Sequence, residues 1–155
     1  MKKSQYIVLF IGLVLTAVLF LLPRTQQDRK VNAATPLDLK VEEAVRIVQS
    51  GENPMQGVMM LRAVLAENPE HLEATYSLGM LSMQSNQYEK AIERFKRVLE
   101  LDANRTEVWQ SIGQAYEGLE ENIKAITAYR SFLKYTDDVK AKSALEERIK
   151  QLENN

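Results

Sequence analysis

Residues 78–102 read LGMLSMQSNQYEKAIERFKRVLELD, and residues 112–136 read IGQAYEGLEENIKAITAYRSFLKYT. The second stretch begins 34 positions after the first and repeats most of its special residues. The shift superposes Leu78-Gly79 on Ile112-Gly113, Tyr88 on Asn122, Ala91 on Ala125, Phe95 on Tyr129 and Leu99 on Leu133. A repeat of this period predicts a stack of similar units, each burying its apolar side against the next.

A third unit follows when the same shift is applied toward the N-terminus. The backward shift superposes Ala91 on Gly57, Phe95 on Leu61, Val98 on Val64 and Leu99 on Leu65. The three units are predicted at residues 38–71, 72–105 and 106–139. Each contains two runs with apolar residues at helical spacing, which in the middle unit are Ala74, Leu78 and Leu81, then Tyr88, Ala91, Ile92, Phe95, Val98 and Leu99. Gly79 and Ala91 are expected where the two helices approach closely.

These residues resemble a known repeat. The spacing of Trp109, Ile112-Gly113, Tyr116, Ala125 and Tyr129 is similar to that of the tetratricopeptide repeat, and so is that of Leu78-Gly79, Ala91 and Phe95. The resemblance covers residues 38–139 and departs in the first unit, where Val45 replaces the helix-contact glycine and Gly57 the usual alanine. It implies an all-α fold, a right-handed superhelix (α-solenoid) of about three helical hairpins.

Residues 140–155 are predicted to form a capping helix. Asp137 or Asp138 can cap its start, and the residues expected on its inner face are Ala141, Leu145, Ile149 and Leu152. Without such a lid the last repeat would expose its apolar side.

The N-terminal segment predicts a membrane anchor. Residues 6–22 form a run of 17 residues without a charge, near the lower limit for a helix that crosses a bilayer. Residues 1–5 are read as a short tail and residues 23–37 as a flexible linker. The alternative is a cleaved signal peptide, but a proline, an arginine and two glutamines follow the apolar run where small residues are expected. A retained signal anchor is the preferred interpretation. A very short tail before a first apolar helix usually stays in the cytoplasm, so the repeats are expected to be exported. In a bacterium this predicts a single-pass protein of the inner membrane with the repeats in the periplasm.

Composition argues against catalysis and against nucleic acid. The 155 residues carry no cysteine and one histidine, His71, which is expected in a solvent-exposed connection. No phosphate-binding loop, nucleophile elbow or zinc motif occurs, so we expect no enzyme activity, no cofactor and no metal. Residues 1–30 are basic and the rest is mildly acidic, which disfavours binding to a phosphate backbone. Arg94, Lys96 and Arg97 are interpreted as part of a solvated helix face.

The resemblance implies a concave groove lined by the first helix of each hairpin, where the family usually binds peptides or extended segments. Carried over position by position, the groove residues are Glu42, Arg46 and Gln49, then Tyr76, Met80 and Met83, then Gln110, Gln114 and Glu117. The lysines and asparagines of the family's carboxylate clamp are not among them. Met80 and Met83 have the alternative role of packing between hairpins.

Two functions follow from these observations. The first is a membrane-anchored adaptor or scaffold that binds a segment of a partner protein in the groove. The second is a structural accessory subunit of a larger membrane assembly, such as a secretion, translocon or cytochrome c maturation complex. Self-association through the open edge of the first unit remains an alternative for both.

Overall fold

The computed structural model describes residues 34–154 of the protein. Over this range the chain forms seven helices and no strand, which confirms the all-helical prediction. The helices are α2 (Pro36–Ser50), α3 (Pro54–Glu67), α4 (Leu72–Gln84), α5 (Tyr88–Leu101), α6 (Val108–Gly118), α7 (Asn122–Leu133) and α8 (Val139–Glu153).

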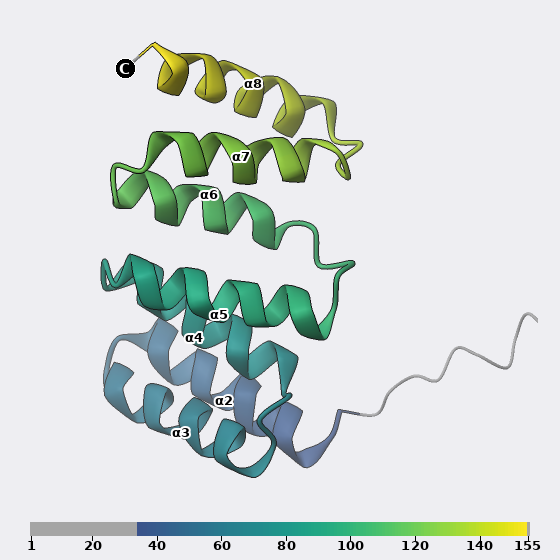
Figure 1. Cartoon of the computed structure of the whole chain (residues 1–155). Coiled ribbons are helices and arrows are strands. Elements are labelled where there is room, and N and C mark those ends of the chain that lie inside the picture. Colours follow the sequence, from purple (N-terminus) through teal and green to yellow (C-terminus); the bar gives the residue numbers. More distant parts are fainter. Residues whose placement is uncertain (1–33, 155) are drawn as a thin grey trace, which may run out of the picture. The chain divides into compact units, whose positions relative to one another are not determined.

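The helices form hairpins that stack on one another (Figure 1). The pairs α2/α3, α4/α5 and α6/α7 make the most extensive contacts, and α3 then packs on α4 and α5 on α6. Helix α8 lies against α7 at the C-terminal end of the stack. Each hairpin therefore buries an apolar side against its neighbour, as expected of a helical repeat.

Side-chain caps fix several helix starts. The Thr35 hydroxyl accepts a hydrogen bond from the Asp38 N–H, and the Asp38 carboxylate accepts one from the Thr35 N–H at 2.7 Å. Pro36 supplies the first helical residue, where a missing N–H costs nothing. Helix α2 therefore begins inside the range 23–37 that was expected to be linker. Asn53 caps α3 in a similar way, again followed by a proline.

The turn inside each of the last two hairpins contains a residue with left-handed backbone geometry. These residues are Asn86, with φ of 54°, and Glu120, with φ of 59°, which the 34-residue shift superposes. In the first hairpin Gly51, with φ of 73°, ends α2. Glycine and asparagine adopt this conformation at low cost, whereas glutamate does not. Glu120 is therefore a strained position.

We expect Glu120→Gly to raise the free energy of unfolding by about 0.5 kcal/mol, because relief of strain outweighs the added freedom of the unfolded chain. Gly51→Ala is the matched control of opposite sign. No atom lies within 4 Å of a Cβ built at Gly51, so its expected loss of about 1 kcal/mol comes from the backbone alone. Urea denaturation measures both changes. A loss of stability in Glu120→Gly would contradict the assignment of strain.

Inside the second and third hairpins an aromatic ring packs on a glycine. A Cβ at Gly79 would lie 2.6 Å from Cε1 of Phe95, and one at Gly113 would overlap the ring of Tyr129. Phe95 is fully buried and Tyr129 is 2% exposed. The close approach predicted at Gly79 is thus confirmed, and a ring from the facing helix occupies the space that a side chain would need.

In the first hairpin the two helices also approach closely, but through a glycine on the second helix instead of the first. Val45 stands where the later hairpins have glycine, and the approach is made instead at Gly57 of α3. A Cβ at Gly57 would lie 2.5 Å from both the Ala44 carbonyl oxygen and a methyl group of Val48. The departure from the repeat pattern at Gly57 therefore lets the α3 backbone contact α2 directly.

One contact joins the second hairpin to the third through a further glycine. A Cβ at Gly118, the last residue of α6, would lie 2.5 Å from the ring of Tyr88, the first residue of α5. The repeat does not conserve this pair, because the 34-residue shift replaces Tyr88 by Asn122 and carries Gly118 back to Gln84. The contact is specific to the junction between these two units.

Helix α8 covers the last hairpin. Asp138 caps it by accepting hydrogen bonds from the N–H groups of Lys140 and Ala141 at 2.9 and 3.2 Å. The buried residues of α8 are Leu145, Ile149 and Leu152. They form one apolar cluster with Tyr129 and Phe132 of α7. Arg148 adds a polar link across to α6, because its guanidinium donates to the Glu117 carboxylate, which also accepts from the Tyr129 hydroxyl.

This link predicts a pH-dependent contribution to stability. Burial alone raises the pKa of Glu117, but hydrogen bonds from Arg148 and Tyr129 outweigh it and hold the pKa below its ordinary value. A lowered carboxyl pKa stabilises the fold above the unfolded-state pKa, near 4.5, and this contribution is lost as pH falls through the lower folded-state pKa.

Arg148→Gln is therefore expected to lower the free energy of unfolding by about 1 kcal/mol or less at pH 7, since the pair is partly exposed, and by less below about pH 4. Urea denaturation at pH 7 and pH 3 measures the difference. Lys150→Gln, which changes an exposed charge on the same helix, is the control. An Arg148→Gln deficit that stays constant over this pH range would contradict the role of Glu117.

The predicted tail, anchor and first part of the linker, residues 1–33, lie outside the described residues. Within residues 34–154, the helices are too short or too polar to span a bilayer.

Candidate peptide-binding channel

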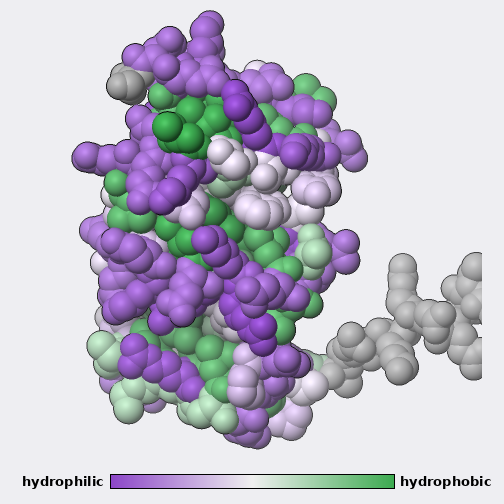
Figure 2. All heavy atoms as spheres, in the orientation of Figure 1, coloured by the Kyte–Doolittle hydropathy of each residue, from purple (hydrophilic) through white to green (hydrophobic). Residues whose placement is uncertain are grey.

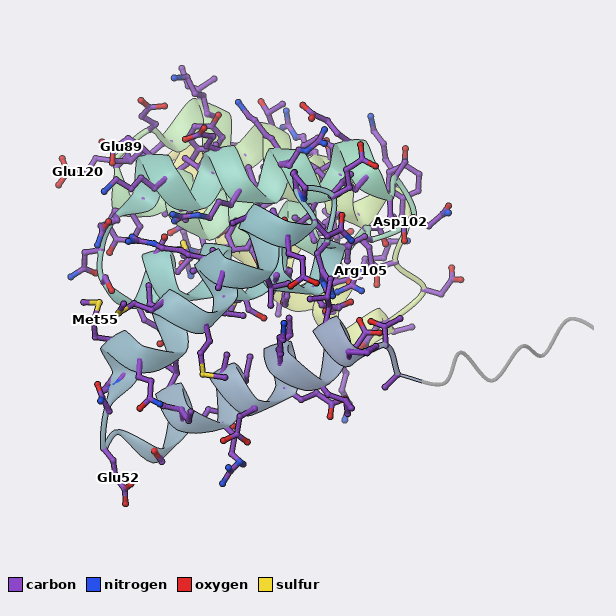
Figure 3. The ribbon with its side chains drawn as sticks, turned by 90° about the horizontal axis from the view of Figure 1, so that it is seen from below. Glu52, Met55, Glu89, Asp102, Arg105 and Glu120 are labelled. Atoms are coloured by element: carbon purple, nitrogen blue, oxygen red, sulfur yellow. The ribbon has the colours of Figure 1, made fainter. Side chains whose placement is uncertain are left out.

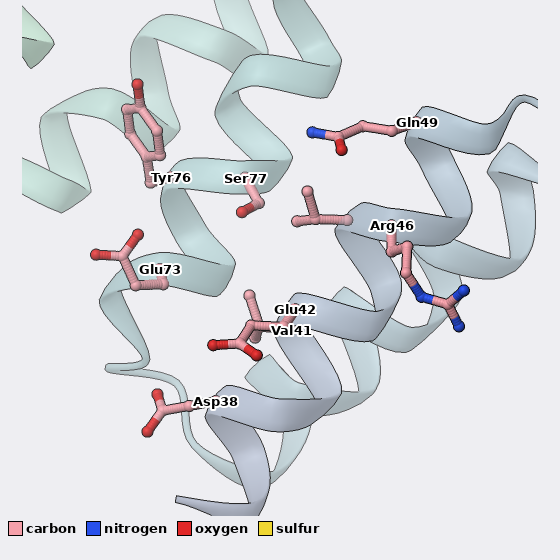
Figure 4. Close-up of a pocket in the computed structure, with 9 residues that line it drawn as sticks. Asp38, Val41, Glu42, Arg46, Gln49, Glu73, Tyr76 and Ser77 are labelled. Carbon is pink, nitrogen blue, oxygen red and sulfur yellow. The ribbon is translucent and has the colours of Figure 1, made fainter. Parts of the chain in front are cut away.

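A hollow of about 520 Å³ lies between α2 and α4. Figure 4 shows side chains from the two helices around it. Its lining residues are Asp38, Val41, Glu42, Val45, Arg46 and Gln49 from α2, and Glu73, Tyr76 and Ser77 from α4. The first helices of two consecutive hairpins thus supply its walls.

A second hollow of about 240 Å³ continues the first toward the C-terminal ends of the same helices. The two share Val45, Gln49, Tyr76 and Ser77, and the second adds Val48, Met80, Leu81 and Gln84. We refer to the two hollows together as the α2–α4 channel. Because they share four residues, a single extended segment could occupy both.

The two ends of the channel differ in polarity. The first hollow has three carboxylates, on Asp38, Glu42 and Glu73, and one guanidinium, on Arg46. The second is lined mainly by the apolar residues Val45, Val48, Tyr76, Met80 and Leu81, with two glutamines. The channel therefore has an acidic compartment and an apolar compartment. On the face of the molecule seen in Figure 2, hydrophobic areas lie between hydrophilic side chains.

Existing contacts modify the charges of the acidic compartment. Arg46 forms hydrogen bonds with both carboxylate oxygens of Glu43, at 2.6 to 2.9 Å, and points away from α4 (Figure 4). Hydrogen bonds from the side chain and backbone of Thr35 hold the pKa of Asp38 below the ordinary value for an aspartate. Glu73 pairs with Arg105 at 2.5 Å.

Tyr76 stands at the boundary of the two compartments. Its ring packs against Phe95, with ring centroids 6.0 Å apart, and the Arg105 guanidinium lies 5.4 Å from its centroid. The half-buried ring thus contacts both a core residue and a cation. Tyr76 therefore gives the channel an aromatic wall that is packed against the core.

The structure brings together five of the nine groove residues expected from the sequence. Those that line the channel are Glu42, Arg46, Gln49, Tyr76 and Met80. The other four, Met83, Gln110, Gln114 and Glu117, are not among the residues that line either hollow. Met83 packs, like Met80, against the apolar cluster around Phe95, and Glu117 is held by Tyr129 and Arg148.

Three further polar residues of the channel were missed by the sequence analysis. Asp38 lies one helical turn before Glu42, and Glu73 and Ser77 lie beside Tyr76 on α4. Asp38, Glu42 and Arg46 follow one another at intervals of four residues, which places them on the same face of α2. Glu73 and Ser77 are also four residues apart and share a face of α4. The periodicity of the two helices could therefore have identified them.

The expectation for His71 was wrong. The residue is only 8% exposed, and Nδ1 accepts a hydrogen bond from the Ala74 N–H at 3.4 Å, so His71 caps α4. Since Nδ1 accepts, the neutral ring carries its proton on Nε2, which lies 3.2 Å from Asp38. His71 joins the start of α4 to that of α2.

Within residues 34–154, no group of three or more acidic, histidine or cysteine side chains could hold a metal.

The interpretation of Arg94 as a solvated residue was also wrong. Its guanidinium donates to the Leu78 carbonyl oxygen at 3.4 Å and to the Ser82 hydroxyl. Burial, together with the nearby charge of Arg62, lowers the pKa of Arg94. Arg94 therefore ties α5 to α4, whereas Lys96 is exposed and Arg97 makes only exposed ion pairs, with Glu100 and Glu70.

Family models of the tetratricopeptide repeat match residues 52–115 and 106–138. The general transcriptional corepressor trfA of Dictyostelium discoideum is 33% identical over 69 residues, which are 44% of this chain and 5% of that protein. The chain thus spans a small fraction of this relative's length.

Two solved structures have a similar fold. The MamA D159K mutant 1 has a TM-score of 0.59 at 20% identity, over 78% of this chain and 72% of that one. The type III secretion translocator chaperone SycD of Yersinia enterocolitica has a TM-score of 0.67 at 12% identity, over 76% of this chain and 83% of that one. At these identities the likeness concerns the fold alone.

Proposed function

This chain is a tetratricopeptide repeat protein, and from this premise we propose that it is a non-catalytic adaptor that holds a segment of another protein in the α2–α4 channel. Proteins with these repeats mediate protein–protein interactions, which supports the general assignment. The observation that carries the specific proposal is the pair of adjoining hollows with a common wall. Their combined volume is in the range of clefts that bind ligands in proteins.

Site-specific photocrosslinking in intact cells tests this assignment. A photoreactive phenylalanine derivative at Ser77, in the channel, is expected to capture one or a few discrete proteins. The same derivative at Ser143, an exposed residue on α8, is the matched control and is expected to capture none of them. Equal crosslinking from both positions, or none from Ser77, would refute binding in the channel.

A structural accessory subunit is a second candidate, supported by exposed apolar side chains on the first hairpin. Leu39 is 55% exposed, and Met55 and Met59 are each 63% exposed. Met55 and Glu52 lie at the outer edge of this hairpin (Figure 3). A permanent subunit would bury these residues against its assembly. Photocrosslinking from Met59 that is stronger than from Ser77 would favour this role.

We also propose that residues 6–22 anchor the adaptor in a bacterial inner membrane, with the repeats in the periplasm. The support is the uncharged run of 17 residues. An anchor would concentrate the channel at the membrane surface and raise its effective concentration toward membrane partners.

Alkaline phosphatase, which is active only after export, is the reporter for this arrangement. A fusion at the C-terminus is expected to be active and to stay with the membrane pellet after alkaline extraction. Deletion of residues 6–22 is expected to abolish both properties. An inactive full-length fusion would place the repeats in the cytoplasm.

A further inference from the structure

The polarity of the α2–α4 channel specifies the chemistry of its ligand. We propose that the channel binds an extended partner segment in which a lysine or arginine precedes or follows an apolar residue by about two to four positions. This inference rests on the proposed function and names the class of segment that the channel selects.

The positive charge is inferred from the acidic compartment. Three carboxylates line it against one guanidinium, and that guanidinium is engaged by Glu43. Glu42 forms no ion pair within residues 34–154, and its carboxylate reaches from α2 toward α4 (Figure 4). Glu73 is partly neutralised by Arg105, so Glu42 and Asp38 carry most of the unbalanced charge. Complementary charge at this end would favour a basic segment over an acidic one.

The apolar residue is inferred from the second compartment. Val48, Met80 and Leu81 line it and are each only partly buried, so apolar surface remains available to a ligand. The flexible thioether of Met80 can adjust to side chains of different shape. Tyr76 would contact the segment between its basic and apolar residues, because it belongs to both compartments.

The spacing follows from the geometry of α2. Glu42 and Val48 are six residues apart, which corresponds to about 9 Å along the helix axis. An extended chain advances about 3.3 Å per residue, so about three residues cover this distance. The range of two to four positions allows for the alternation of side chains along an extended segment.

A displayed library of random 12-residue peptides, selected on the immobilised full-length chain, tests the inference. We expect the enriched peptides to share a lysine or arginine about two to four positions from an aliphatic or aromatic residue. The most enriched peptide is then synthesised with a fluorescent label, together with a version in which its basic residue is replaced by glutamate. Fluorescence anisotropy measures the binding of both.

Glu42→Lys is the decisive variant. It is expected to weaken binding of the selected peptide by about threefold to tenfold and to improve binding of the glutamate version. Glu52→Lys makes the same charge change in the turn after α2, outside the channel, and is expected to leave both affinities unchanged (Figure 3). Circular dichroism and thermal unfolding establish that both variants remain folded.

The outcomes separate this inference from the proposed function. If Tyr76→Ala abolishes binding but the selected peptides are acidic or show no charge preference, the channel binds peptides and the inferred chemistry is wrong. The same conclusion follows if Glu42→Lys changes neither affinity. If no peptide is enriched, the inference is wrong, and the crosslinks from Ser77 decide separately whether the channel binds a folded partner.

Discussion

Replacing Phe95 by alanine is expected to lower the free energy of unfolding by about 3 to 5 kcal/mol. The ring is fully buried and packs against Gly79 of the facing helix and against Tyr76. Its loss leaves a cavity in the middle of the stack, where neighbouring helices on both sides limit collapse. A domain of this size has a stability of about 5 to 15 kcal/mol, so the variant would lose a large part of it. Urea denaturation followed by circular dichroism gives the value.

A double-mutant cycle shows whether the ring and the glycine act as a pair. Gly79→Ala alone is expected to cost about 1 to 3 kcal/mol, because its Cβ would lie 2.6 Å from the Phe95 ring. In a Phe95→Leu background the same change is expected to cost less than about 1 kcal/mol, since the smaller side chain leaves room for the methyl group. Equal costs in both backgrounds would show that the two residues are energetically independent.

Removal of residues 139–155 is expected to destabilise the last hairpin by several kcal/mol. The truncation takes away Leu145, Ile149 and Leu152, each of which contributes about 1.5 to 3 kcal/mol through burial. It also exposes Tyr129 and Phe132 of α7, which share a cluster with them. The shortened protein should unfold at lower temperature and bind a hydrophobic dye such as anilinonaphthalene sulfonate under native conditions.

The outward face of α8 provides the control for this truncation. A variant with Lys142, Glu146 and Lys150 all changed to alanine retains the apolar face and should unfold within about 0.5 kcal/mol of the wild type. If the truncated protein unfolds at the same temperature as this variant and binds no dye, α8 is not required as a lid.

Much of the fold could be predicted because the residues that pack together within a hairpin recur in the sequence with the period of the repeat. The spacing between glycine and aromatic residue is the same in two hairpins, for Gly79 with Phe95 and for Gly113 with Tyr129. In both hairpins the ring packs where a side chain on the facing helix would otherwise lie. The 3.6-residue periodicity then indicates which side of each helix is buried. Gly57 was recognised as a departure, but only the structure shows that α3 contacts the α2 backbone there.

Contacts between elements distant in sequence could not be predicted in this way. Glu117 was assigned to the groove by its position, yet Arg148 engages it from 31 residues away. The charge pattern predicted a solvent-exposed Arg94, but its side chain is partly buried and forms hydrogen bonds with α4. His71 is an uncommon cap, so the type of residue gave no indication of its role. Such polar contacts depend on how hairpins are placed beside one another, which periodicity does not encode.

The packing of Tyr88 on Gly118 gives the array a fixed order. A copy of residues 72–105 inserted directly after the original would place Gln84 of the copy, instead of Gly118, against the first Tyr88. A glutamine side chain would then occupy the space of the ring, and the new junction would be strained. Lengthening this protein by duplication would therefore require a compensating change of Gln84 to glycine in the copy. The units share one repeat pattern, but one unit cannot replace another, because the residues at their junctions differ.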